Sequence, residues 1–103
     1  MSNYADDVAK YTSPVDQAVV DAIVKYCGIA LRDRDSSLVS ASDRAELDRV
    51  RDGFAAKKLG LAPDAAANAI KGVCEKMKGD NSKSRVTFYY LLAEASNTLD
   101  KLR

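Results

Sequence analysis

The residues with the clearest capacity for binding chemistry lie in the stretch KGDNSKSR, from Lys78 to Arg85. Two serines and two cations stand there directly before an aromatic and aliphatic block: Ser82, Ser84, Lys83 and Arg85. The first turn of a helix has backbone N–H groups without intrahelical partners, and these attract anions. The stretch therefore predicts a place that holds an anion or a partner's carboxylate. Ordinary helix capping with solvated cations is the competing interpretation.

The same stretch lacks the features of a nucleotide-binding loop. Such a loop needs several glycines and a lysine at a fixed spacing, so that backbone amides can approach a phosphate. GDNSKS offers Gly79 alone, and its lysine stands at a different spacing. We therefore predict no nucleotide site.

A weak nucleic-acid binder is the alternative function that this stretch supports. Two helices joined by a short turn with a glycine resemble helix-turn-helix spacing. The local charge is +3, because four cations stand against Asp80 alone (four minus one): Lys76, Lys78, Lys83 and Arg85. A recognition helix, however, keeps a long polar face for the bases, whereas Val86 to Leu92 is mostly apolar.

Charge over the whole chain argues against a general polyanion binder. The chain has 16 basic and 15 acidic residues, a net charge of +1. Binding to nucleic acid or to a membrane surface depends mainly on excess positive charge. We therefore do not expect nucleic acid or a membrane as a partner.

Known catalytic and metal-binding patterns are missing. Without histidine the chain cannot build a histidine-based triad, and Cys27 and Cys74 lack paired-ligand spacing for zinc. In DRAELDRVRD the acidic residues alternate with arginines at helical pair spacing, which favours a salt-bridged face toward solvent. We predict no catalytic residue, no metal site and no cofactor.

Length and composition predict one modest core. At 103 residues, 47% hydrophobic and 30% charged, the chain fits a single domain over residues 1–103. No apolar run reaches the ~18 residues of a membrane span, and MSNYADDVAKY does not read as a signal peptide. We expect a cytoplasmic protein, with Cys27 and Cys74 as reduced, shielded thiols.

About five helices, four of them substantial, are predicted to position these residues. A short segment covers residues 4–11, and Ser13 before Pro14 then signals a helix start. Apolar residues surround most of a helix from Val15 to Leu31, which predicts that this helix is central. RDRDSSLVSASD is the predicted irregular connection.

The second half of the chain has clear helix ends. Asp43 caps a helix that runs to Leu59 and stops at Gly60. Pro63 opens the next helix, and Gly79 is predicted to end it as a left-handed cap.

The last helix is predicted from an apolar period of three and four residues. Its seam consists of Phe88, Leu92, Ala95, Leu99 and Leu102. Phe88 and Leu92 should pack against the helix from Val15 to Leu31, with Lys83 and Arg85 exposed. The fold class is therefore all-α, a small irregular bundle.

Three segments carry a resemblance to a known family: IVKYCGIALRDRDSSLVS, FAAKKLGL and VCEKMKGDNSKSRVTFYYLLAE. They resemble an uncharacterised family of small bacterial proteins, a domain-of-unknown-function family, over almost the whole chain. The resemblance implies a compact, cytoplasmic, bacterial all-α protein. No activity comes with the family, so no functional residue is carried over.

The leading functional interpretation is a non-enzymatic interaction or regulatory module that acts through a helical surface. Its partner is expected to be another protein or a second copy in a homodimer. The adjacent Tyr89 and Tyr90 cannot both point along one narrow face, so an exposed tyrosine would favour a partner site and two buried ones plain packing. The candidate binding residues are Lys78, Ser82, Lys83, Ser84, Arg85, Tyr89 and Tyr90.

Overall fold

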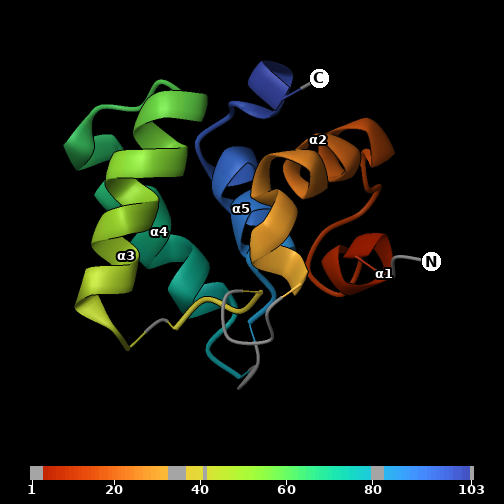
Figure 1. Cartoon of the computed structure of the whole chain (residues 1–103), viewed down its shortest axis with the longest axis horizontal. Coiled ribbons are helices and arrows are strands. Elements are labelled where there is room, and N and C mark those ends of the chain that lie inside the picture. The colour runs from red at the N-terminus through yellow and green to blue at the C-terminus, as the bar shows by residue number, and fades with distance from the viewer. Residues whose placement is uncertain (1–3, 33–36, 41, 80–82, 103) are drawn as a thin grey trace.

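The computed structural model describes residues 4–32, 37–40, 42–79 and 83–102. Within these residues the chain is all-helical, as predicted, and its extended pairing is limited to one antiparallel bridge between Leu38 and Ser84. Figure 1 shows the elements in space. In chain order they are α1 (Tyr4–Val8), α2 (Gln17–Cys27), the 3₁₀-helix η1 (Gly28–Arg32), α3 (Arg44–Val50), the π-helix η2 (Arg51–Lys58), α4 (Pro63–Lys76), α5 (Arg85–Ala95) and the 3₁₀-helix η3 (Leu99–Leu102).

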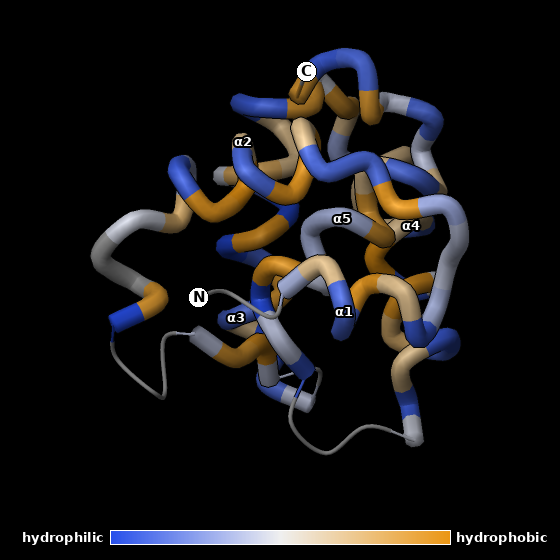
Figure 2. Tube along the Cα trace, turned by 90° about the vertical axis from the view of Figure 1, so that its right-hand side faces the viewer, coloured by the Kyte–Doolittle hydropathy of each residue, from blue (hydrophilic) through white to orange (hydrophobic). Residues whose placement is uncertain are grey.

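The central helix is α5. Its eight consecutive residues from Val86 to Ala93 are all buried. The elements α1, α2, α4, η2 and η3 all pack against it, and Figure 2 shows its trace in the middle of the molecule. A helix that is apolar on every side is stable in water only when it is enclosed in this way. The prediction of a central helix from Val15 to Leu31 was therefore wrong.

Instead, α2 is an amphipathic helix at the periphery. It packs on α5 and also contacts α1 and η3, while Tyr26 is 44% exposed. The residues buried on its inner face are Val19, Val20 and Ile23. Its wide apolar surface in the sequence thus covers one strongly buried face and a half-buried margin.

Both ends of α2 differ from the prediction. The helix begins at Gln17 because the carboxylate of Asp16 accepts hydrogen bonds from the first free backbone N–H groups, at 3.0 and 3.4 Å, so Asp16 and not Ser13 caps it. It ends at Gly28, whose φ of +51° breaks the α-helical path, and η1 follows.

One helical rod, α3 followed by η2, returns along α4 as an antiparallel hairpin. Its predicted start is confirmed, since the Asp43 carboxylate accepts from the N–H groups of Ala45 and Glu46 at 3.0 and 3.4 Å. Its predicted end is confirmed too, because Gly60 has a φ of +69° directly after the last turn. The second half of the rod has the wider π-helical turn, which the sequence reasoning did not anticipate.

The ends of the last two helices required corrections. Pro63 opens α4 as predicted, but the helix stops at Lys76 and Gly79 does not have a positive φ. The last helix stops at Ala95, which is exposed and not part of a seam. Asn97 takes a φ of +59°, so the chain turns before η3 begins.

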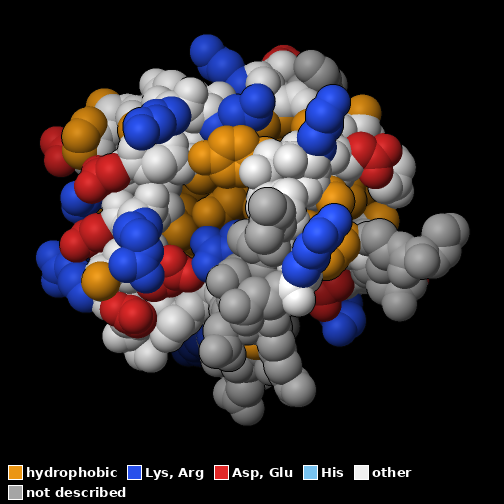
Figure 3. Space-filling view, viewed as in Figure 1, with side chains coloured by type: hydrophobic (Ala, Val, Ile, Leu, Met, Phe, Trp, Pro, Cys, Tyr) orange, Lys and Arg blue, Asp and Glu red, His pale blue; other side chains and the backbone are white. Residues whose placement is uncertain are grey.

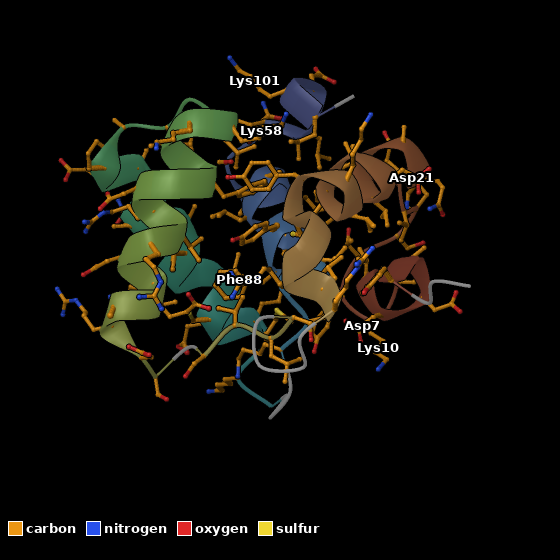
Figure 4. All side chains as sticks on the ribbon, viewed as in Figure 1. Asp7, Lys10, Asp21, Lys58, Phe88 and Lys101 are labelled. Carbon is orange, nitrogen blue, oxygen red and sulfur yellow. The ribbon has the colours of Figure 1, made fainter. Side chains whose placement is uncertain are left out.

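The predicted burial of Phe88 and Leu92 in the last helix is confirmed. Phe88 and Leu92 are both fully buried, and α5 packs against α2. Figure 4 shows Phe88 near the centre of the bundle. None of the described helices is long and apolar enough to cross a bilayer.

Candidate functional site

A groove of about 410 Å³ lies between α3 and α4. The η2 part of the rod packs closely on α4, whereas α3 itself stands further from α4 and leaves the groove open. Eight residues line it: Arg44, Leu47, Asp48 and Arg51 from the rod, and Ala67, Ile70, Lys71 and Cys74 from α4. On both walls the positions follow i, i+3, i+4, i+7, so each wall is one helix face two turns long.

The lining is apolar at depth and small at the rim. Ile70 is 5% exposed, and Leu47 and Cys74 are half-buried. Ala67 is exposed, so its small side chain leaves access from solvent. The groove therefore presents an apolar strip that solvent can reach.

Charged side chains surround this strip. Asp48 Oδ1 lies 3.4 Å from Arg51 Nη1 and 4.0 Å from Arg44 Nε. Lys71, on the opposite wall, has no hydrogen bond or ion pair within the described part of the chain. Figure 3 shows cations and carboxylates interspersed over α3, at the left of the view, which agrees with the salt-bridged face predicted for DRAELDRVRD.

A buried ion pair sets the position of α3. The side chains of Arg85 and Glu46 are 13% and 11% exposed, and the Arg85 guanidinium binds the Glu46 carboxylate. The guanidinium also donates to the hydroxyl of Tyr89 at 2.9 Å and to the carbonyl oxygen of Leu38 at 3.2 Å. Arg85 thus ties the core side of α3 to the start of α5, while the groove face of α3 remains on the outside.

The prediction that Arg85 is exposed was therefore wrong. Burial alone would lower the pKa of Arg85, but the Tyr89 hydroxyl and the Glu46 carboxylate outweigh burial and raise it. Burial raises the pKa of Tyr89, and the nearby guanidinium opposes that rise. Arg85 therefore remains charged, and Tyr89 remains neutral, across the physiological range.

Backbone hydrogen bonds also hold the segment around Arg85. The N–H of Val39 donates to the carbonyl oxygen of Lys83, and the N–H of Arg85 donates to that of Ser37, each at 2.8 Å. Lys83 is half-buried, although it was predicted to be exposed. This segment is a packed edge of the bundle more than an open turn.

Of the other candidates in the basic stretch, the structure describes Lys78, Lys83 and Ser84. Lys78 is exposed after the end of α4. Ser84 occupies the N-cap position of α5, but its side chain makes no capping hydrogen bond. Ser82 lies outside the described residues, as do Asp80 and residues 33–36 of the predicted connection.

Tyr89 and Tyr90 are both interior, at 6% and 1% exposure. The hydroxyl of Tyr90 accepts a hydrogen bond from the N–H of Asp16 at 2.8 Å. The Tyr89 ring stacks on Phe54, with centroids 4.0 Å apart and planes at 13°. Two buried tyrosines favour plain packing at this position.

Both cysteines are free thiols, and they are half-buried instead of fully shielded. Burial raises the pKa of Cys27 to about 11, with Arg85 opposing the rise. Burial also raises the pKa of Cys74, and Lys83 opposes it. At neutral pH each thiol is protonated and serves as a small apolar surface, in the case of Cys74 on the groove wall.

Sequence reasoning missed the groove. The apolar residues that line it follow a helical period, and that period does not distinguish a core contact from a groove. No pattern in the sequence showed that α3 and α4 would diverge beside Leu47 and Ile70. Nor do three or more cysteine or carboxylate side chains gather as a metal site in the described ranges.

A model of one protein family, described as protein of unknown function (DUF2853), matches residues 3–100. The chain belongs to the DUF2853 family. This confirms the resemblance seen in the sequence to a domain-of-unknown-function family, and the all-helical fold agrees with what that resemblance implied. No curated protein matches the chain.

Proposed function

We propose that this DUF2853 protein is a non-enzymatic interaction module that binds a partner protein through the α3–α4 groove. The groove itself carries the proposal: two helix faces diverge over an apolar strip that solvent can reach. Covering such surface stabilises a complex by about 25 cal/mol per Å² of apolar area removed from water. A partner that covers Leu47 and Cys74 gains this energy without unfolding any part of the bundle.

The ion pair between Arg85 and Glu46 supports the proposal, because it holds one wall of the groove in place before binding. A wall that is already ordered loses little conformational entropy when a partner arrives. Glu46 and Leu47 are neighbours on α3, so the same helix turn carries the internal anchor and the outer binding face.

The alternative is a weak nucleic-acid or anion binder at the Lys78 to Arg85 stretch, and it has less support. The guanidinium of Arg85 already binds a carboxylate, a hydroxyl and a carbonyl oxygen. Lys83 is half-buried, which leaves Lys78 as the exposed cation of the three.

The two free thiols are consistent with action in the cytoplasm, the compartment that we propose.

The proposal is tested with two exposed alanines of α4. Ala67 lines the groove, whereas Ala65 lines a separate hollow between α4 and the end of α5. Wild-type protein, Ala67→Glu and Ala65→Glu are immobilised and exposed to extract of the source cells, after thermal melts have verified that all three fold.

A discrete protein should be retained by the wild type and by Ala65→Glu and lost from Ala67→Glu. The retained protein, once purified, should show the same order of affinities in a titration. Capture of the same proteins by all three baits, or loss with Ala65→Glu alone, would exclude the α3–α4 groove as the binding surface.

A further inference from the structure

We infer that the occupant of the α3–α4 groove is an amphipathic helix with acidic residues on both sides of its apolar face. The inference rests on the proposed function and specifies its partner. It follows from the shape of the groove and from the charge on its two walls.

The shape of the groove favours a helix over other peptide conformations. Addition of a strand needs an exposed sheet edge, and the described residues contain no strand, only the bridge between Leu38 and Ser84. Proline-rich segments bind between aromatic side chains, and no aromatic residue lines this groove. An apolar cleft between two helices is the usual seat of an amphipathic helix.

The length of the groove gives the length of the contact. Each wall runs over two helical turns, which is about 10 Å at 1.5 Å per residue. A helix that presents apolar residues at i, i+3, i+4 and i+7 covers the same two turns. The small Ala67 leaves room on one wall, and the partner's larger side chains can point toward Ile70 and Leu47.

The charge of the groove gives the sign of the partner. Three cations and one carboxylate line it, which leaves +2 (three minus one), and the cations are Arg44, Arg51 and Lys71. Arg51 is also occupied by Asp52, whose Oδ1 lies 2.8 Å from Arg51 Nε. The cations available to a partner are Arg44 and Lys71. The Arg44 side chain is 91% exposed, and its Nε lies 4.0 Å from Asp48 Oδ1.

Arg44 and Lys71 stand on opposite walls, Arg44 on α3 and Lys71 on α4. Carboxylates on the two flanks of the partner's apolar face would each meet one of them. Such exposed pairs select the correct partner and speed its association more than they raise the affinity. A basic helix of the same apolar pattern would meet repulsion on both sides.

The test uses synthetic helices as probes. One peptide of about 16 residues, long enough for appreciable helicity in an alanine-rich sequence, has leucine at i, i+3, i+4 and i+7 with glutamate on both flanks. Its twin has lysine in place of each glutamate. Affinity is measured by fluorescence anisotropy at low and high salt, and the site by chemical-shift changes in the ¹⁵N-labelled protein.

The acidic peptide should bind wild-type protein at least about tenfold more tightly than its basic twin, because both flanking contacts change sign. Lys71→Glu should weaken the acidic peptide about fivefold and improve the basic one, whereas Ala65→Glu should change neither. Shift changes should lie on residues of α3 and α4. High salt should reduce the difference between the twins.

Equal binding of the twins, or indifference of the acidic peptide to Lys71→Glu, would overturn the inference. Shift changes at the same residues with decanoate, a single-chain carboxylate, when neither peptide binds, would also overturn it. If capture from the extract depends on Ala67 but the acidic peptide does not bind, the inference of an acidic helix as the occupant is wrong and the proposed function stands. If capture shows no dependence on Ala67, the proposed function fails independently of the peptides.

Discussion

Replacing Arg85 with alanine should destabilise the protein strongly, although the residue reads as a surface cation in the sequence. The change removes a guanidinium that contacts Glu46, Tyr89 and the carbonyl oxygen of Leu38. It leaves the Glu46 carboxylate, whose side chain is only 11% exposed, without its main partner. Removal of one member of a buried pair typically costs about 3–5 kcal/mol.

We expect a loss near the lower end of that range, about 3 kcal/mol. Arg49 Nη2 lies 3.3 Å from the same carboxylate and remains to compensate part of its charge, but the Arg49 side chain is 69% exposed, so solvent weakens the contact. A loss of this size lowers the melting temperature by roughly 12–24 °C in a domain of about 100 residues.

Chemical denaturation followed by circular dichroism measures the free energy of unfolding. Lys78→Ala is the matched control, because Lys78 is exposed and its removal should change stability by less than about 0.5 kcal/mol. The double variant Arg85→Met with Glu46→Leu should recover much of the loss, since it removes both buried charges together. If the free energy of unfolding of Arg85→Ala lies within about 0.5 kcal/mol of the wild-type value, the ion pair does not hold α3 and the reasoning is refuted.

Three further predictions follow from backbone geometry, burial and titration. Gly60→Ala should destabilise the protein by about 1 kcal/mol, because φ at Gly60 is +69°. Gly79→Ala should be neutral or slightly stabilising, since an added Cβ there meets no atom within 4 Å. Equal melting temperatures of the two variants would contradict this. Phe88→Ala should cost roughly 3–5 kcal/mol, as the side chain is 0% exposed, and a melt near that of the wild type would show that Phe88 is not the anchor of α5. The pKa of Cys27 rises from 9.0 to about 11 on folding, so thiol labelling of the native protein at pH 8 should be about 100-fold slower than that of a free thiol. The stability that this thiol contributes should be complete below pH 9 and lost as the pH rises to 11. A native labelling rate equal to that in denaturant would exclude the shift.

Local chemistry made much of the secondary structure predictable. Asp43, Gly60 and Pro63 mark helix ends because capping, positive φ and the missing proline N–H each act within a few residues. The period of Phe88 and Leu92 likewise predicts a buried helix face, since a helix repeats its faces over three and four positions. These signals depend on residues that are close together in the sequence.

The choice of the central helix was not local. Two segments are apolar over a wide surface, and only the packed structure shows that α5 buries eight consecutive residues whereas α2 buries three. A hydrophobic pattern records how much surface must be buried, and it does not record which neighbours bury it.

By itself, the sequence determined an all-helical chain, the helix ends marked by Asp43, Gly60 and Pro63, and the burial of Phe88 and Leu92 in its last helix. The tertiary structure alone decided that Arg85 is buried, because its partner Glu46 is 39 residues away and no local pattern links them. It also decided that α3 stands apart from α4, so that the half-buried Leu47 and the buried Ile70 line a groove. Interactions over a few residues can be read along the chain, whereas the candidate site depends on contacts that exist only after the helices have packed.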